Sequence, residues 1–350
     1  MNEIIERKHP GSIVKKSLEA WNMSSKEFSI RSCISERTLS DLINCKGPVT
    51  FDIATKLATY FGNSVEFWMN LQTQYDLYVN ESIYDKEIKE DYSCIKNSIH
   101  YLKELSIVDD NDDKCSIVKK TREAICVNRL ISLKESNAFV SLKELNSKTI
   151  NNEFEKNLWL ALSLTLARKN YVNEFNKNKL LDSLKEIRSL TTQSPRTFMP
   201  RLNEILSECG VSFVLLPYLA KSNIFGATKW LSSSNVMLAM SNRGNRADTF
   251  WFTLFHEIAH VTYEHKRYML LSIEEDEDKE ADEFAKNILI NPKDWKEFVS
   301  KNNYDERSIK TFARKINILP HIVLGRLHNE NLVEYGSLDK KLGVFYRENY

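Results

Sequence analysis

Apolar residues recur at helical spacing through the first part of the chain. Between residues 10 and 77 they return every three or four positions in five short runs, which predicts five amphipathic helices. Residues that favour helix N-caps precede three of these runs, and a glycine ends one of them. These residues are Ser24 or Ser25, Ser35, Thr50 and Gly62. The pattern predicts an all-α domain over residues 9–78.

The middle of the chain, residues 79–186, is polar, glycine-free and irregularly amphipathic. The runs at 86–105 and 154–175 are predicted to be helical. The charged run DDNDDK at 109–114 is predicted to be a loop that separates helices. We interpret this region as a helical connector and packing layer.

The pattern changes after Cys209. Three short runs rich in β-branched and apolar residues follow, at 211–219, 226–232 and 236–242. They predict the strands of a small sheet. An apolar helix is then predicted over 251–265 and an acidic one over 274–290. The predicted fold class is therefore mainly α and multidomain: an all-α domain, a helical connector, and an α+β domain with a small sheet over residues 187–350.

Composition narrows the class of protein. The chain has 350 residues, a length that suits two or three domains. Its net charge of +1 argues against a generally basic nucleic-acid coat and against a membrane-surface protein. No apolar run approaches the ~20 residues of a membrane span, and the first residues lack the apolar core of a signal peptide. Six scattered cysteines without a Cys-x-x-Cys pair favour reduced thiols, so we expect a cytoplasmic protein.

A metal-binding pattern lies in the apolar helix. His256 and His260 are four residues apart, so both imidazoles project from one face, and imidazole is a good zinc ligand. Glu257 is turned by about 100° around the axis, from where it can take the proton of a water that attacks a peptide carbonyl. Apolar neighbours indicate a buried helix, in which these polar groups would be costly without a partner. The spacing predicts a Zn²⁺ peptidase site with Glu257 as general base.

A catalytic zinc usually has three protein ligands, so a third is expected from the acidic helix. The apolar face of that helix is formed by Ala281, Phe284, Ala285, Ile288 and Leu289. Glu277 and Asp278 fall roughly 50° either side of its centre, whereas Glu280 falls more than about 100° away, toward solvent. Asp282 lies one turn after Asp278. We predict Asp278 as the ligand and Asp282 as acceptor from a histidine ring nitrogen, with Glu277 and then Glu280 as alternatives.

Four segments of the C-terminal half match one family in order. They are GATKWL (226–231), DTFWFTLFHEIAH (248–260), KEADEFAKNILINP (279–292) and PHIVLGRLHNE (320–330). From about residue 187 to the end, the chain resembles the ImmA/IrrE metallo-endopeptidases. The resemblance implies a gluzincin-like domain with a short sheet and an active-site helix, in a cytosolic protease that switches off a repressor. It also implies Asp278 at the third-ligand position, where the family normally has glutamate, and Ala259 where glycine is common.

The segments HPGSIVKKSLEAWNMSSKEFS and ISERTLSDLINCKGPVTFDIATKLATYFGNSVEFWMNLQTQYDL cover about residues 9–77. This region resembles the HigA-type helix-turn-helix antitoxins of the Xre class. The resemblance implies that the third helix, residues 35–44, enters the DNA major groove, with contacts from Arg37, Thr38 and Ser40. It also implies a homodimer on paired half-sites. Cys33 replaces the glycine that is usual in the turn before this helix.

Two functions are consistent with these residues. The first is a zinc endopeptidase with its own DNA-binding domain, which cleaves a partner protein, a repressor or a toxin–antitoxin component. Its substrate would pair with an exposed edge strand, expected at 236–242. The second is an antitoxin or repressor that binds operator DNA and a cognate toxin, with the peptidase fold as a non-catalytic sensor or docking module.

Residues 1–78 hold nine basic and nine acidic residues, so a helical dimerisation or docking module is the alternative to DNA binding there. Outside the candidate sites, we expect His321 to be a loop residue. The six tryptophans are expected to belong to the cores.

Overall fold

The computed structural model describes residues 8–134, 153–263 and 275–346, apart from the side chains of Ser82 and of residues 275–278. The chain divides into two compact units, Met1–Glu90 and Asp91–Tyr350. The domain boundaries expected at 78 and 186 stay predictions.

Five helices build the first unit: α1 (Pro10–Ala20), α2 (Ser25–Ser32), α3 (Glu36–Ile43), α4 (Phe51–Phe61) and α5 (Val65–Ile95). The predicted caps are present, because the Ser24, Ser35 and Thr50 side chains each accept a hydrogen bond from a backbone N–H three residues later. Gly62 ends α4 in the left-handed conformation. The core is apolar and includes Val14, Phe28, Leu39, Leu57 and Trp68.

Helix α5 is longer than the sequence predicted. The amphipathic pattern of the N-terminal domain ended near residue 78, whereas the helix continues to Ile95. Glycine and proline are both absent between residues 65 and 95, so no residue breaks the backbone hydrogen bonding. The boundary between the two compact units falls within this helix.

The second unit begins with short helical elements and a long buried helix. They are η1 (Lys96–Ser98), α6 (Ile99–Glu104), α7 (Lys114–Ile125), η2 (Leu130–Lys134) and α8 (Glu153–Lys169). The acidic run at 109–114 separates α6 from α7, as predicted. The predicted helix over 154–175 ends early, at Lys169. The next residue, Asn170, donates from its side chain to Ser212 and to the carbonyl of Phe213, which directs the chain along the sheet.

The three predicted strands form one mixed sheet. They are β1 (Val211–Leu216), β2 (Gly226–Trp230) and β3 (Val236–Ser241), in the order β1-β3-β2. β3 runs parallel to β1 and antiparallel to β2, with Val214 opposite Ala239 and Thr228 opposite Leu238. The expectation that the strand near 236–242 is an edge was wrong: β3 is buried along its whole length and paired on both sides. Among the described residues, β1 and β2 form the edges of this sheet.

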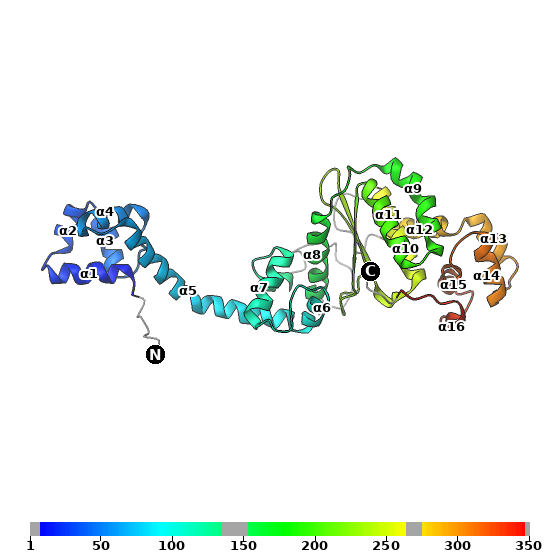
Figure 1. Ribbon diagram of the computed structural model, residues 1–350, viewed down its shortest axis with the longest axis horizontal. Helices are drawn as coiled ribbons and strands as arrows, with labels where there is room; N and C mark the ends of the chain where they lie inside the picture. Colours follow the sequence, from blue (N-terminus) through cyan, green and yellow to red (C-terminus); the bar gives the residue numbers. More distant parts are fainter. Residues whose placement is uncertain (1–7, 135–152, 264–274, 347–350) are drawn as a thin grey trace. The chain divides into compact units, whose positions relative to one another are not determined.

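Helices cover both faces of this sheet (Figure 1). α8 packs on β1 and β3 from one face, while α10 (Pro195–Glu208) and α11 (Ala247–Thr262) pack from the other. α12 (Glu275–Leu289) and α15 (Pro320–Asn329) pack against α11. The remaining elements are α9 (Lys177–Ser189), η3 (Leu190–Thr192), η4 (Arg243–Asn245), α13 (Pro292–Val299), α14 (Glu306–Lys315) and α16 (Asp339–Leu342).

Within the described residues, no helix is both long and apolar enough to cross a membrane. The predicted fold class is confirmed: the protein is mainly helical, with one small sheet in its C-terminal part. The apolar core of the second unit joins the inner face of the sheet to α11, whose side chains Trp251, Leu254, Phe255 and Ile258 are fully buried.

Candidate functional site

Helix α11 carries the three predicted site residues on its buried part. Glu257 and His260 are 5% and 2% exposed, whereas the His256 side chain keeps 20% of its surface. The apolar residues before and between them fix the helix against the sheet, because Phe255, Ile258 and Ala259 are fully buried. The sequence therefore places two imidazoles and a carboxylate in a largely buried environment, in which the His256 side chain keeps the most exposed surface.

The two imidazoles converge. The Nε2 atoms of His256 and His260 lie 3.1 Å apart. Two nitrogens bound tetrahedrally to one zinc at ~2.0–2.1 Å would be roughly 3.3 Å apart, so this pair fits two positions of a zinc site. The Nδ1 atom of His256 lies 2.9 Å from Oδ1 of Asp282 on α12, the contact predicted for Asp282. A proton on Nδ1, donated to this carboxylate, leaves the Nε2 lone pair of His256 facing His260.

The carboxylate of Glu257 is held by β2. The Thr228 hydroxyl donates to Oε2 of Glu257 over 2.7 Å. Gly226 lies so close that a Cβ there would be 2.5 Å from Oε1 of Glu257. Only glycine leaves room for the carboxylate at this point of the edge strand. Neither residue was predicted to belong to the site; the glycine that opens an otherwise β-forming run was the available signal.

The third corner of the metal site stays a prediction. Asp278 and Glu277 lie in α12, but their side chains are outside the described part of the structure. Glu280 is exposed, in the direction that the helix geometry predicted. Among the residues whose side chains are described, no three acidic, histidine or cysteine groups gather as a metal site.

A second polar cluster surrounds the start of α11. Arg246 makes a bidentate ion pair with Asp248 at 2.9 and 3.0 Å and a further pair with Asp339 at 2.9 Å. Its Nη2 atom lies 2.9 Å from Nε2 of His321, whose Nδ1 contacts the backbone of Val344. The expectation that His321 is a loop residue was wrong, since it lies in the first turn of α15 and is fully buried. Burial lowers the pKa of His321.

The C-terminal residues complete this arrangement. The backbone N–H of Ala247 donates to the carbonyl of Val344 over 2.9 Å, and the Trp251 indole donates to the Tyr346 hydroxyl over 2.9 Å. The first turns of α11 are thus held by a segment about ninety residues further along the chain. The largely buried cluster ties the start of the helix that carries the histidines to the C-terminal residues.

The candidate DNA contacts lie on the surface of the first unit. Arg37 and Ser40 are exposed, Thr38 is half-buried, and the Thr38 hydroxyl lies 2.7 Å from that of the N-cap Ser35. Cys33, which ends α2, has a left-handed φ of 56°, the conformation that the usual glycine adopts without strain. Trp21 departs from the expectation that all six tryptophans are core residues, because it is 52% exposed.

Comparisons with known proteins match both ends of the chain. Residues 229–328 match the IrrE N-terminal-like domain of the M78 peptidase family. An uncharacterised HTH-type transcriptional regulator of Escherichia coli, YddM, is 36% identical over 76 residues, which are 22% of this chain and 81% of that protein. Antitoxin HigA-1 of Vibrio cholerae is 38% identical over 72 residues, 21% of this chain and 68% of the antitoxin.

One solved structure among those similar to the chain is the Pseudomonas aeruginosa antitoxin HigA with the higBA promoter. It is 29% identical, covers 24% of this chain and 94% of that chain, and has a TM-score of 0.23.

Proposed function

We propose that this chain, which belongs through its N-terminal region to the HigA-type HTH regulators and carries an IrrE N-terminal-like domain at residues 229–328, is a zinc-dependent endopeptidase coupled to a DNA-binding domain. It cleaves a partner protein, a repressor or a toxin–antitoxin component, in a regulatory circuit. One observation carries the proposal: the Nε2 atoms of His256 and His260 converge to 3.1 Å beside the buried carboxylate of Glu257.

His256, His260 and Asp278 would hold the zinc, with Glu277 and then Glu280 as alternatives to Asp278. Bound zinc would supply Lewis acidity toward the peptide carbonyl and the attacking water. Asp282 keeps the proton of His256 on Nδ1, so that Nε2 stays a donor for the metal. A purely structural metal site would not require the general base that Glu257 provides.

Glu257 takes the proton of the attacking water and passes it to the leaving amine. The Thr228 hydroxyl and the Gly226 backbone, which leaves room for the carboxylate because it has no Cβ, fix the direction of the Glu257 side chain. Gly226 and Thr228 belong to an edge strand, so a peptide that pairs with the outer edge of β2 would pass next to Glu257. We therefore propose that the substrate pairs with β2, and not with the strand at 236–242 that was expected from the sequence.

The first unit would bring the peptidase to operator DNA. With α3 in the major groove, the exposed Arg37 and Ser40 and the half-buried Thr38 would face base edges and phosphates. Paired half-sites would require a homodimer. This part of the proposal is supported by the curated regulators and antitoxin that match the same region.

The second candidate is an antitoxin or repressor that binds operator DNA and a toxin, with the peptidase fold as a non-catalytic sensor. The V. cholerae relative, whose name is antitoxin, favours it. So does aspartate at position 278, which is one methylene shorter than glutamate.

Glu257→Gln separates the two candidates. Wild type should cleave one of the proteins encoded beside the gene, whereas Glu257→Gln should lose at least about 100-fold in rate while it keeps its zinc. The matched control is Glu81→Gln, an exposed glutamate of α5 that should behave as wild type. If wild type and Glu257→Gln repress the operator equally and neither cleaves a partner protein, the antitoxin or repressor function would be favoured. His256→Ala should lose zinc; full zinc content in that variant would contradict the ligand assignment.

A further inference from the structure

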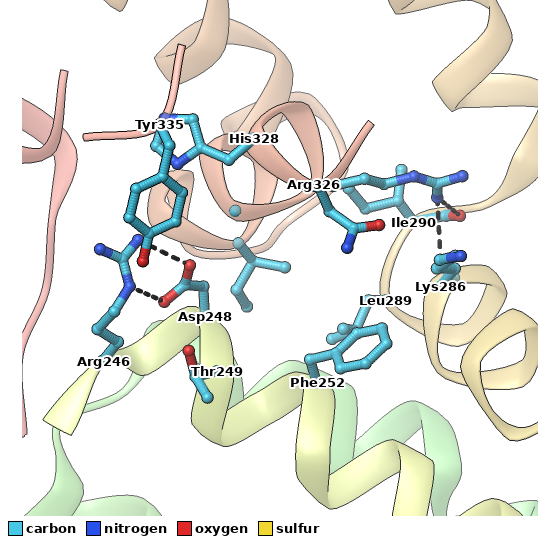
Figure 2. Close-up of a pocket in the computed structure, with 13 residues that line it drawn as sticks. Arg246, Asp248, Thr249, Phe252, Lys286, Leu289, Ile290, Arg326, His328 and Tyr335 are labelled. Atoms are coloured by element: carbon cyan, nitrogen blue, oxygen red, sulfur yellow. Dashed lines mark hydrogen bonds and ion pairs between the residues drawn. The ribbon is translucent and has the colours of Figure 1, made fainter. Parts of the chain in front are cut away.

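A cavity of about 370 Å³ lies beside the candidate site (Figure 2). It is lined by the first turns of α11, the last turn of α12, α15 and Tyr335, and it opens to the surface at its rim. Thr249, Phe252 and Leu289 lie around it in Figure 2. Ile322 of α15 adds a further apolar side chain to its lining. This volume is in the range of sites that bind small organic groups.

The cavity continues the face of α11 that carries the histidines. Thr249 and Phe252 precede His256 by seven and four residues, so all three lie on one side of the helix. The rings of Phe252 and His256 are 6.4 Å apart between centroids. On the opposite wall, Lys286 follows Asp282, the partner of His256, by one turn of α12. One helical turn corresponds to ~5 Å along the axis. If the substrate bond is cleaved at His256, the side chain of the residue next to that bond can therefore reach the cavity.

The cations around the cavity are already engaged. Arg246 is paired with Asp248 and Asp339. Arg326 donates to the carbonyls of Lys286 and Ile290, pairs with Glu330 over 2.9 Å and stacks over the Trp295 ring at 4.4 Å. Lys286 lies 3.3 Å from the exposed Glu283. A charged guest would have to compete with these partners, whereas an apolar guest would meet Phe252, Leu289, Ile290 and Ile322.

We infer that this cavity is the subsite for a large uncharged side chain, aromatic or branched aliphatic, of the substrate residue adjoining the cleaved bond. This subsite rests on the proposed peptidase function, and it would determine which substrate side chains the peptidase prefers. A wide apolar pocket discriminates by the number of buried carbons, with each methylene changing kcat/KM by roughly 10-fold or more. Large apolar residues should therefore be preferred over glycine or aspartate by at least about 100-fold.

The test uses the full chain and two readouts. Saturation-transfer NMR on the Glu257→Gln protein measures binding without turnover, with N-acetyl amides of phenylalanine, leucine, glycine and aspartate as probes. Cleavage of a random peptide library by zinc-loaded wild type, read by mass spectrometry, measures selectivity. Thr249→Phe fills the cavity, and Thr311→Phe, at an exposed position of α14, is the matched control. Asn329→Trp closes the cavity from its exposed rim and serves if Thr249→Phe does not fold.

The phenylalanine and leucine amides should bind, and one position next to the cleaved bond should select large apolar residues. The cavity-filling variants should weaken binding by at least about 10-fold, while Thr311→Phe changes neither readout. Library cleavage without such selectivity, or selectivity that survives Thr249→Phe and Asn329→Trp, overturns the subsite and leaves the proposed function intact. Absence of cleavage of the library and of all partner proteins overturns both.

Discussion

Helices α3 and α11 carry the residues on which the proposed function depends, and they present them in opposite ways. On α3 the candidate contacts Arg37 and Ser40 are exposed. The apolar residues Leu39 and Leu42 are buried in the core, and Ile43 packs against it. On α11 the site residues Glu257 and His260 are themselves buried. Functional side chains that are exposed can change without disturbing the fold, whereas functional side chains that are buried also contribute to the packing of the core.

This difference predicts how substitutions behave. Changes at the outward positions of α3 should alter binding and leave the free energy of unfolding unchanged. Changes around α11 should alter activity and stability together, because partners such as Thr228 and Asp282 satisfy buried polar groups as well as position them. Four experiments test the contrast.

Gly226→Ala should have the largest effect. The new Cβ would be 2.5 Å from Oε1 of Glu257, so strand or carboxylate must shift. We expect at least about a 100-fold loss of peptidase activity and a loss of about 1–3 kcal/mol in stability, by urea unfolding. The control Gly62→Ala, with φ of 74° and open space around it, should lose about 1 kcal/mol and keep full activity. Full peptidase activity in Gly226→Ala would contradict the proposal that Glu257 acts as general base from this position.

Arg37→Ala should reduce affinity for operator DNA by about 10- to 100-fold at fixed salt, by fluorescence anisotropy. Its free energy of unfolding should stay within about 0.5 kcal/mol of wild type, because the side chain is exposed. Lys56→Ala, on α4, removes a cation outside α3 and is the control. An equal loss in both variants would indicate general charge attraction in place of contacts from α3.

His321→Gln should reduce the dependence of stability on pH. Burial lowers the pKa of His321 in the folded protein below its ordinary value of 6.5, so below about pH 6.5 the unfolded chain binds the extra proton. Wild type should be fully stable above that pH and lose up to about 1.4 kcal/mol per pH unit below it. Urea unfolding at pH 7.5 and 5.5 measures the difference. The exposed His100, changed to glutamine, is the control; identical pH profiles for all three proteins would refute the assignment.

Cys33→Gly should have the smallest effect. The left-handed φ of 56° strains any residue with a Cβ, so glycine should raise the unfolding free energy by up to about 1 kcal/mol. Cys33→Ala keeps the Cβ and should not gain stability. A thermal melt of both variants decides it, and no change in DNA affinity is expected from either.

Local sequence patterns predicted most of the fold. Caps such as Ser24 and Thr50 act within one turn, and the strands near 211, 226 and 236 follow from short runs of β-forming residues. Strand order did not follow from these runs, because β3 becomes central only through pairing with β1 and β2. The length of α5 was missed because an irregular amphipathic pattern does not end a helix that lacks breakers.

Within the candidate site, the contacts that could be predicted from the sequence are those between residues that share a helix face. His256 and His260 are four residues apart, and the face of α12 directed Asp282 toward them. Gly226 and His321 were missed because their contacts, with Glu257 and with Arg246 and Val344, join residues that are distant in the chain. Local sequence patterns do not predict such long-range contacts.

The return of residues 339–346 to the start of α11 bears on the order of synthesis. A ribosome adds ~5–20 residues per second, so the helices through Phe61 leave it roughly 15 to 60 s before Tyr346 does. Until then, Ala247, Trp251 and Arg246 lack the partners that hold the peptidase helix. A nascent chain can thus fold its HTH unit well before its peptidase domain. Protease digestion of stalled chains whose last residue is 338, and which therefore lack residues 339–346, should leave α1–α4 protected and α11 cut.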